Sequence, residues 1–299
     1  MNRTRGETLW FWLFAGPALA GLLAFNVWPM LYSLWLSFCR YEVLAPPEFI
    51  GLQNYRYLFT HDPAFWPSVR VTLVFTVAQL PLALAGALGF ALLLNQPVRG
   101  RGFWRAVFFL PSILPQAAFA VVFGYIFQAD GGLLNRVLAL AGIQGAAWTT
   151  SPTWALPVLI VVSLWGFGYP MVIFLAALQD VPRELHEAAH IDGADGWARF
   201  RHITLPLISP IIFFNVVMGI IGALKVFDLA YAFSVSQAQA TPGGPARATL
   251  FYGLNLYQQA FGFFHLGLAS AMAWLLFAFI AVLTYVNFRA GRHWVHYGD

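Results

Sequence analysis

The sequence predicts an all-α integral membrane protein whose chain crosses the bilayer six times. Of its 299 residues, 60% are apolar and only 9% are charged, whereas a soluble protein is about 25% charged. The apolar residues also gather into long charge-free runs, and a helix needs roughly 20 such residues to cross a hydrocarbon core about 30 Å thick. The sequence lacks the short alternating segments typical of a transmembrane β-barrel.

Charged residues mark the limits of the six runs. Backbone groups inside hydrocarbon must satisfy their own hydrogen bonds, so each run is predicted to be helical. The first run is too long for the apolar region of a signal peptide, and we expect it to remain as an anchor. In chain order the predicted spans lie between Glu7 and Arg40, between Arg70 and Arg99, between Arg105 and Asp130, over 154–178, from Pro206 to Lys225 and Asp228, and over 266–288.

We expect two parts in this chain. Residues 1–70 form the N-terminus, the first membrane helix and an external segment, and residues 71–299 form a five-helix core that includes the loop 180–206. Six spans place both termini on one side of the membrane. The flanks on that side carry ten Arg residues and the opposite flanks carry five, which predicts that both termini are cytoplasmic. The same scatter of basic residues explains the pI near 9.4 without a nucleic-acid partner.

Motifs of catalysis and metal binding do not occur in the sequence. Cys39 is the single cysteine, which rules out an intramolecular disulfide and a Cys-rich metal site. There is no phosphate-binding Gly-x-x-x-x-Gly-Lys loop, no His-Glu-x-x-His and no Gly-x-Ser-x-Gly elbow. His186 and His190 have helical spacing but no evident third ligand. We therefore expect no catalytic residue, no cofactor and no metal, so the chain is not predicted to be an enzyme.

The loop 180–206 carries the most specific pattern in the chain. Pro182 can begin a short helix. Gly193 and Gly196 allow a sharp reversal, and Trp197, Phe200 and Ile203 then follow at helical spacing. Pro206 marks the predicted return to the membrane. A helix–glycine–helix elbow of this kind favours docking to a partner, and a plain connecting loop is the alternative.

The residues of this loop resemble the EAA signature of the membrane subunits of ABC importers. In that signature Glu-Ala-Ala is followed at fixed spacing by Gly, by Ile and by Leu-Pro. An Asp-Gly-Ala sequence is also common in the family. The matching residues are Glu187, Ala188, Ala189, Asp192, Gly193, Ala194, Ile203, Leu205 and Pro206.

The resemblance extends over nearly the whole chain. Further segments are similar to the MalF/UgpA-like carbohydrate-uptake branch of these permeases. Residues 236–240 look like a small insertion relative to that branch. The segments are Gly51–Tyr55, Phe109–Pro111, Val226–Asp228, Gly243–Pro245 with Thr249, Tyr257–Phe261 and Gly267–Ala271.

The resemblance implies a type I ABC importer permease fold with a cytoplasmic coupling helix, in a prokaryotic inner membrane. It further implies four kinds of partner: a second homologous permease, two cytoplasmic ATP-binding subunits, an external substrate-binding protein and the lipid bilayer. The expected cargo is a sugar or oligosaccharide, which the binding protein selects. ATP hydrolysis is expected on the partner subunits.

The resemblance also implies a docking site for the ATPase. Glu187 is expected to fix the elbow through charged hydrogen bonds, the two alanines to keep the helix slim, and Gly193 to make the turn. The two aromatic residues are candidate apolar anchors, although packing under the permease itself is equally compatible with the sequence. The expected docking residues are Glu187, Ala188, Ala189, Asp192, Gly193, Trp197 and Phe200.

Five residues are candidates for the substrate pathway. Gly166 and Tyr169 match positions that lie by the bound sugar in the family, with ordinary aromatic packing as the alternative for Tyr169. Asn215 is a polar residue in the fifth span, suited to a substrate contact or to a hydrogen bond between helices. Lys225 and Asp228 lie in the outer part of that span, where charges usually face a cavity or one another.

Other functions remain open at this point. The same architecture could import glycerol-3-phosphate or a glycerophosphodiester. An ion-coupled secondary transporter would show inverted repeats and intramembrane acidic residues, and Asp228 is the single acidic residue placed in a span. A membrane enzyme would need a convergent nucleophile or metal set, and the sequence offers none.

Overall fold

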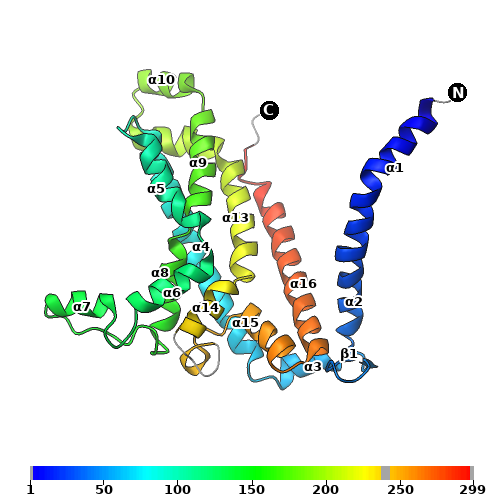
Figure 1. Ribbon diagram of the computed structural model, residues 1–299. Coiled ribbons are helices and arrows are strands. Elements are labelled where there is room, and N and C mark those ends of the chain that lie inside the picture. The colour runs from blue at the N-terminus through cyan, green and yellow to red at the C-terminus, as the bar shows by residue number, and fades with distance from the viewer. Residues whose placement is uncertain (1–2, 237–242, 297–299) are drawn as a thin grey trace. The chain divides into compact units, whose positions relative to one another are not determined.

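The structure is a computed structural model, and it describes residues 3–236 and 243–296. In this part of the chain the regular elements are helices, apart from one short hairpin (Figure 1). The chain divides into two compact units, residues 1–62 with 256–278 and residues 63–255 with 279–299. The predicted boundary after residue 70 falls inside a helix of the second unit. Residues 237–240, most of the predicted insertion, lie outside the described residues.

The first unit begins with one long helical stretch that contains a turn of π-helix. An antiparallel hairpin follows, in which Cys39 pairs with Phe49. Short helices and the start of the last long helix complete the unit. Its elements are α1 (Arg3–Leu22), η1 (Leu23–Val27), α2 (Trp28–Leu36), β1 (Cys39–Arg40), β2 (Glu48–Phe49), α3 (Gln53–Thr60), η4 (Gln258–Gly262) and the first part of α16 (Leu266–Gly291); α15 (Tyr252–Tyr257) leads into it.

The hairpin of the first unit is held by two of the segments that carry the family resemblance. The Asn54 side chain is buried and donates to the carbonyls of Ser37 and Cys39, each at 2.9 Å. The Gly267 amide donates to the Tyr41 carbonyl at 3.2 Å. A Cβ on Gly267 would collide with the Cys39 carbonyl oxygen. These contacts explain why Asn and Gly stand in those two motifs. Burial also raises the pKa of the Cys39 thiol.

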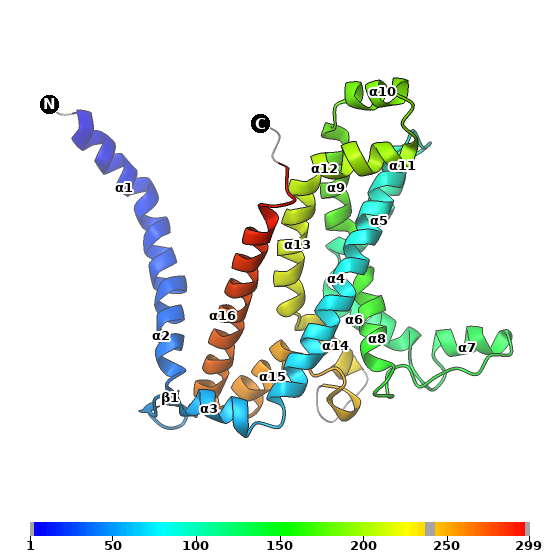
Figure 2. The same ribbon diagram turned by 180° about the vertical axis from the view of Figure 1, so that it is seen from behind.

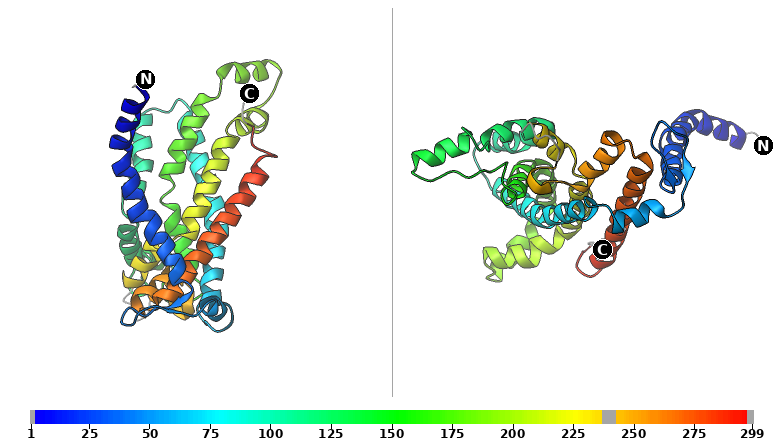
Figure 3. Two further views of the ribbon diagram at one scale, coloured as in Figure 1. Left: turned by 90° about the vertical axis from the view of Figure 1, so that its right-hand side faces the viewer. Right: turned by 90° about the horizontal axis from the view of Figure 1, so that it is seen from below.

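The second unit is a bundle of longer helices. Its central helix, α4 (cyan in Figure 3), runs beside α9 (green) and α13 (yellow). The elements are α4 (Phe65–Asn95), α5 (Arg101–Ile113), α6 (Gln116–Ile126), α7 (Leu133–Leu140), α8 (Ala155–Leu164), α9 (Gly168–Asp180), α10 (Arg183–Ile191), α11 (Gly196–Arg199), η2 (Phe200–Thr204), α12 (Leu205–Leu207), α13 (Ser209–Leu224), α14 (Asp228–Ser236) and η3 (Pro245–Arg247), with the last part of α16.

Two apolar cores stabilise this bundle. One lies where α4 and α9 meet and includes Ala87, Ala91 and Phe174. The small alanines let the two helices approach closely, as is common where membrane helices pack. The other core joins α4, α6, α8 and α14 and includes Phe75 and Phe233. Between these cores the helices leave room for a cavity.

Three helices are long and apolar enough to cross a membrane: Trp10–Leu36, Phe65–Asn95 and Leu266–Gly291. Three further helix pairs also qualify if each bent pair is one span. The bends are 95° between α5 and α6, 42° between α8 and α9, and 66° between the helical run Gly196–Leu207 and α13. The described residues thus hold between three and six candidate spans. Each predicted span overlaps one of these helices or bent pairs, and the count of six stays a prediction.

Candidate functional site

The loop 180–206 forms two short helices that meet at a sharp turn. We call residues 183–207, from the start of α10 to the end of α12, the elbow. Figure 2 shows α10 and α11 beyond the end of α9, set across its direction. Gly193 adopts φ +82°, a conformation that costs residues with a side chain about 1–2 kcal/mol. The predicted role of Gly193 in the turn therefore has a direct backbone reason.

The second half of the elbow is longer than the sequence pattern predicts. After α11 the helix continues as a π-helical turn and as α12 to Leu207, and it breaks at Ile208. Pro206, the predicted point of return to the membrane, lies in α12 just before this break, and the point of return stays a prediction. The membrane helix α13 begins at Ser209, with Pro210 in its first turn, where a residue without an N–H group is tolerated.

Asp195 caps the second helix of the elbow. Its Oδ1 accepts a hydrogen bond from the Ala198 amide at 2.7 Å. An Asp at this position satisfies one of the free amides at a helix start. This role of Asp195 was not predicted from the sequence, although an Asp directly before Gly196 and Trp197 is a recognisable helix-start signal.

The predicted docking residues lie together on the surface of the elbow. Trp197 is 66% exposed and its ring lies 5.6 Å from that of Phe200, which is half-buried. Ile191 is 86% exposed and is not among the predicted docking residues. Ala189 is also half-buried, whereas the other predicted residues are exposed. Those exposed residues are Glu187, Ala188, Asp192 and Gly193.

Glu187 does not fix the elbow from within this chain. Among the described residues its carboxylate has neither a hydrogen-bond partner nor an ion-pair partner, and the side chain is exposed. His186 and His190 lie on the same helix. No group of three or more His, Cys, Asp or Glu residues that could hold a metal ion occurs in the described part of the chain. The elbow is thus a protruding surface with exposed apolar residues and an unpaired carboxylate.

A cavity of about 520 Å³ lies between the helices of the second unit. Residues of α4, α5, α6, α8, α9, α13 and α14 line it. Three of the predicted pathway residues are among them: Gly166, Tyr169 and Asn215. The bend between α8 and α9 places the first two, because Gly166 sits in the break and Tyr169 follows it. The Tyr169 ring is 56% exposed and meets Phe109 edge-on at 5.2 Å.

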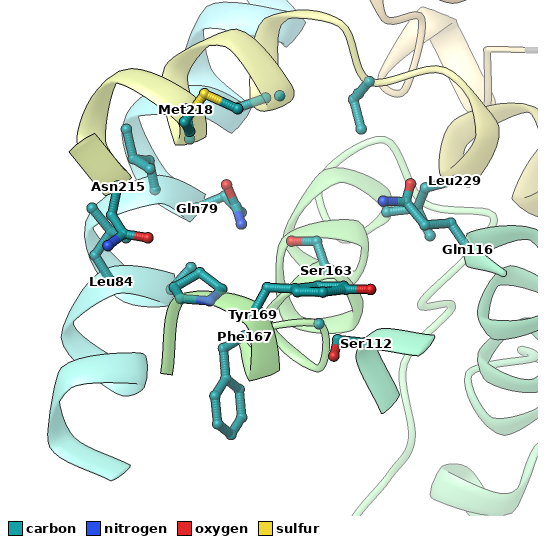
Figure 4. Close-up of a pocket in the computed structure, with 18 of the residues that line it drawn as sticks. Gln79, Leu84, Ser112, Gln116, Ser163, Phe167, Tyr169, Asn215, Met218 and Leu229 are labelled. Atoms are coloured by element: carbon teal, nitrogen blue, oxygen red, sulfur yellow. The ribbon is translucent and has the colours of Figure 1, made fainter. Parts of the chain in front are cut away.

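The polar groups of the cavity are all uncharged. The amides of Gln79 and Asn215 and the hydroxyl of Ser163 point toward the same open space beside Tyr169 (Figure 4). The Asn215 amide nitrogen donates to the Ile211 carbonyl at 2.9 Å, which leaves its oxygen free to accept. Four polar residues were missed by the sequence analysis, because single Gln and Ser residues in apolar runs are weak signals: Gln79, Ser112, Gln116 and Ser163.

Lys225 and Asp228 do not line this cavity, although their neighbours Val226 and Leu229 do. The sequence predicts both charges within the fifth span. Instead α13 ends at Leu224 with Lys225 as its cap, and α14 begins at Asp228. Both side chains are exposed, and the two form no ion pair in the described structure. The helix breaks here, so the two charges flank an interruption of the span.

Comparison with known proteins decides the family. The family model described as the binding-protein-dependent transport system inner membrane component matches residues 79–291. The chain belongs to this family. Over 295 residues it is 42% identical to the probable ABC transporter permease protein YesP of Bacillus subtilis, with 98% of this chain and 94% of YesP covered. It is 36% identical over 286 residues to the lactose transport system permease protein LacF of Rhizobium radiobacter, with 94% and 93% covered.

A solved structure shows the same fold. It is the bacterial alginate ABC transporter in complex with an alginate pentasaccharide-bound periplasmic protein. The match has a TM-score of 0.80 at 20% sequence identity and covers 98% of this chain and 96% of that chain. The type I importer permease fold predicted from the sequence is confirmed.

As a member of this family, the chain is a permease subunit of an ABC importer and an inner membrane component. Its relatives are membrane transport components and not enzymes. The EAA motif is specific to this family, and in this chain it lies on the elbow from Glu187 to Pro206. The elbow and the cavity are therefore the two candidate functional sites of a permease.

Proposed function

We propose that this permease forms, with a sister permease, the pathway by which a sugar or oligosaccharide enters the cell. The observation that carries the proposal is the uncharged polar and aromatic lining of the cavity. Hydroxyl groups of a sugar need both donors and acceptors, which Gln79, Asn215 and Ser163 supply. The apolar faces of a sugar ring pack well on an aromatic ring such as Tyr169.

The size of the cavity and the relatives support this cargo. A volume of about 520 Å³ falls within the range of about 300–1,000 Å³ found for small-molecule sites. The relative LacF is named for lactose transport. A neutral sugar of a few rings therefore fits both the chemistry and the space.

Glycerol-3-phosphate fits this cavity less well. A phosphate is usually met by Arg, Lys or clustered backbone amides. The residues that line the cavity include no Arg and no Lys. Lys225, the nearest candidate in the sequence, lies outside the lining. A glycerophosphodiester meets the same objection, because it also carries a negative charge.

We propose further that the elbow docks on a cytoplasmic ATP-binding subunit. A large exposed aromatic side chain such as Trp197 is a typical anchor in protein interfaces, and the exposed Ile191 adds apolar surface to the elbow. The unpaired Glu187 carboxylate can accept charged hydrogen bonds from the partner. The elbow is joined to α9 and α13, so a push on it would tilt the helices that border the cavity.

The orientation of the chain is part of the same proposal. Ten Arg residues on the flanks of the terminal side, against five opposite, support cytoplasmic termini. The elbow then faces the cytoplasm, where ATP is available. An external binding protein would deliver the sugar from the other side.

An uptake assay tests the proposed cargo. The assembled transporter, with its co-purified subunits and binding protein, is placed in proteoliposomes and offered labelled sugars of increasing length or labelled glycerol-3-phosphate. We expect ATP-dependent uptake of a sugar, lost in Tyr169→Ala and retained in the control Tyr285→Ala. Tyr285 is 65% exposed, against 56% for Tyr169, and lies outside the cavity lining. Uptake of glycerol-3-phosphate without uptake of any sugar, or sugar uptake that is unchanged in Tyr169→Ala, would refute the proposal.

A further inference from the structure

In the orientation proposed above, helix α7 is a short external element, and the proposed transport mechanism does not use it. It lies between α6, which ends at Ile126, and α8, which begins at Ala155. Both neighbours belong to candidate membrane spans. In Figures 1 and 2 α7 extends sideways from these two helices, across the direction of α8.

The half-buried Asn135 holds α7 in place. The Asn135 Nδ2 donates to the carbonyls of Ala129 at 2.8 Å and Ala146 at 3.1 Å. Its Oδ1 accepts from the indole N–H of Trp148. Gly145 packs so closely on Asn135 that a Cβ there would collide with the amide. The helix is thus tied to the segments that lead out of α6 and into α8.

The two faces of α7 differ in burial. Leu134, Asn135 and Leu138 are half-buried against the protein. On the opposite face an apolar stripe runs at the spacing i, i+4, i+7 and is exposed. Its residues are Leu133 at 58%, Val137 at 54% and Leu140 at 89% exposure. No described residue of this chain covers the stripe.

We propose that α7 is an interfacial helix whose exposed apolar stripe is immersed in the outer surface of the bilayer. The position of α7 supports a lipid occupant, because α7 connects two candidate membrane spans and Asn135 ties it to the segments next to the end of α6 and the start of α8. Trp148 and Trp154 meet at 4.9 Å on the same connection, and tryptophans concentrate at the membrane–water interface. Arg136, the single charge of α7, is exposed beside the stripe and can reach lipid phosphates.

The composition of the stripe favours lipid over a protein partner. Leu133, Val137 and Leu140 are aliphatic and carry no polar group. Anchors of protein interfaces are instead enriched in Trp, Tyr and Arg. An apolar helix face at this position inserts about 5–10 Å into the boundary between headgroups and acyl chains.

Fluorescent labels at neighbouring residues test the immersion. Leu140→Cys and Ala139→Cys place an environment-sensitive label on the stripe and on a different exposed side of the same helix. Cys39 is fully buried, and the unsubstituted chain measures its background labelling. The complex purified from its membrane is placed in nanodiscs with nitroxide-labelled lipid. We expect the label at 140 to emit at shorter wavelength and to be quenched by the lipid, whereas the label at 139 is quenched by aqueous iodide.

Two results would overturn the proposal. Equal access of iodide to both labels would mean that α7 stands free in water. A label at residue 140 that is shielded from iodide and from lipid, and becomes exposed to iodide when the accompanying subunits are removed, would mean that a protein covers the stripe. Circular dichroism of each variant, compared with the parent complex, shows whether the helices are intact.

Discussion

The elbow and the cavity are built in opposite ways. The elbow is one continuous segment whose shape depends on a glycine turn at Gly193 and a cap at Asp195. The cavity is assembled from seven helices that are spread from Phe75 to Leu229 in the chain. A continuous segment can move as one body, whereas a cavity made by many helices changes its shape when they shift. The elbow is thus suited to receive a push and the cavity to respond to it.

This comparison predicts that substitutions in the two regions separate coupling from recognition. Changes in the elbow should reduce the rate of ATP-driven uptake at any sugar concentration. Changes in the cavity should raise the sugar concentration needed for half-maximal uptake. Four substitutions test this division, in order of decreasing expected effect.

Gly193→Val should have the largest effect. A β-branched residue is strained at φ +82°, at a cost of about 1–2 kcal/mol, which lowers the ratio of native to alternative turn conformations about 5–30-fold. We expect uptake to fall by a similar factor with an unchanged KM for sugar. Gly196→Val is the matched control, since Gly196 has open space around it and no left-handed backbone. Equal uptake by the two variants would contradict the role of the turn.

Asn215→Leu should weaken recognition. The loss of one hydrogen bond to the sugar costs about 0.5–1.5 kcal/mol, so we expect KM to rise about 2–12-fold while sugar-stimulated ATPase activity at saturation persists. Asn287→Leu is the control. Asn287 makes the same kind of bond, to the Leu283 carbonyl at 2.8 Å, outside the cavity lining. A rise in KM for both variants would point to a general helix effect.

Asp195→Ala should loosen the elbow without destroying it. Loss of a helix cap costs about 0.5–2 kcal/mol. We expect faster hydrogen exchange at the Ala198 amide and a several-fold drop in uptake. Asp195→Asn keeps a capping oxygen and should restore both. If Asp195→Asn behaves like Asp195→Ala, the negative charge of Asp195 supports the elbow, and its capping hydrogen bond does not.

Lys225→Met should have the smallest effect. Lys225 neither lines the cavity nor pairs with Asp228 in the described structure, and exposed substitutions usually change stability by less than about 0.5 kcal/mol. We expect KM and uptake rate to change by less than about twofold. A large rise in KM would show that the pathway extends to the break between α13 and α14. Lys225 would then belong to the region that recognises the sugar.

The same contrast explains what the sequence reveals. The elbow is local, so Glu187, Gly193 and Trp197 stand at readable spacing and the turn at Gly193 was predicted. The membrane helices were also predicted, because hydropathy is local. The right-angle bend between α5 and α6 was not predicted, since Pro115 in a membrane helix is compatible with a mild kink as well as with a full break.

The cavity is harder to derive because its residues meet only in three dimensions. Tyr169 and Asn215 were proposed from the family and from polarity, and both lie in the lining. Gln79 and Gln116 were missed, because a lone amide has no spacing partner nearby in the chain. Lys225 and Asp228 were predicted as pathway residues because they are charged. They flank a helix break and do not line the cavity. Helix α7 was missed because its eight residues are too few to show a helical period that would distinguish it from a loop.

The union of the hairpin with α16 has a consequence for biosynthesis. Trp274 donates to the Ser33 hydroxyl at 3.1 Å across 241 positions of the chain, and Gly267 closes on the β1 backbone. The first unit therefore cannot be completed until the ribosome has made the chain as far as α16. During synthesis the N-terminal helix must wait in the membrane without its native neighbour. A chain truncated before α16 would keep its N-terminal anchor but leave the hairpin unsupported, which marks it for quality-control proteolysis.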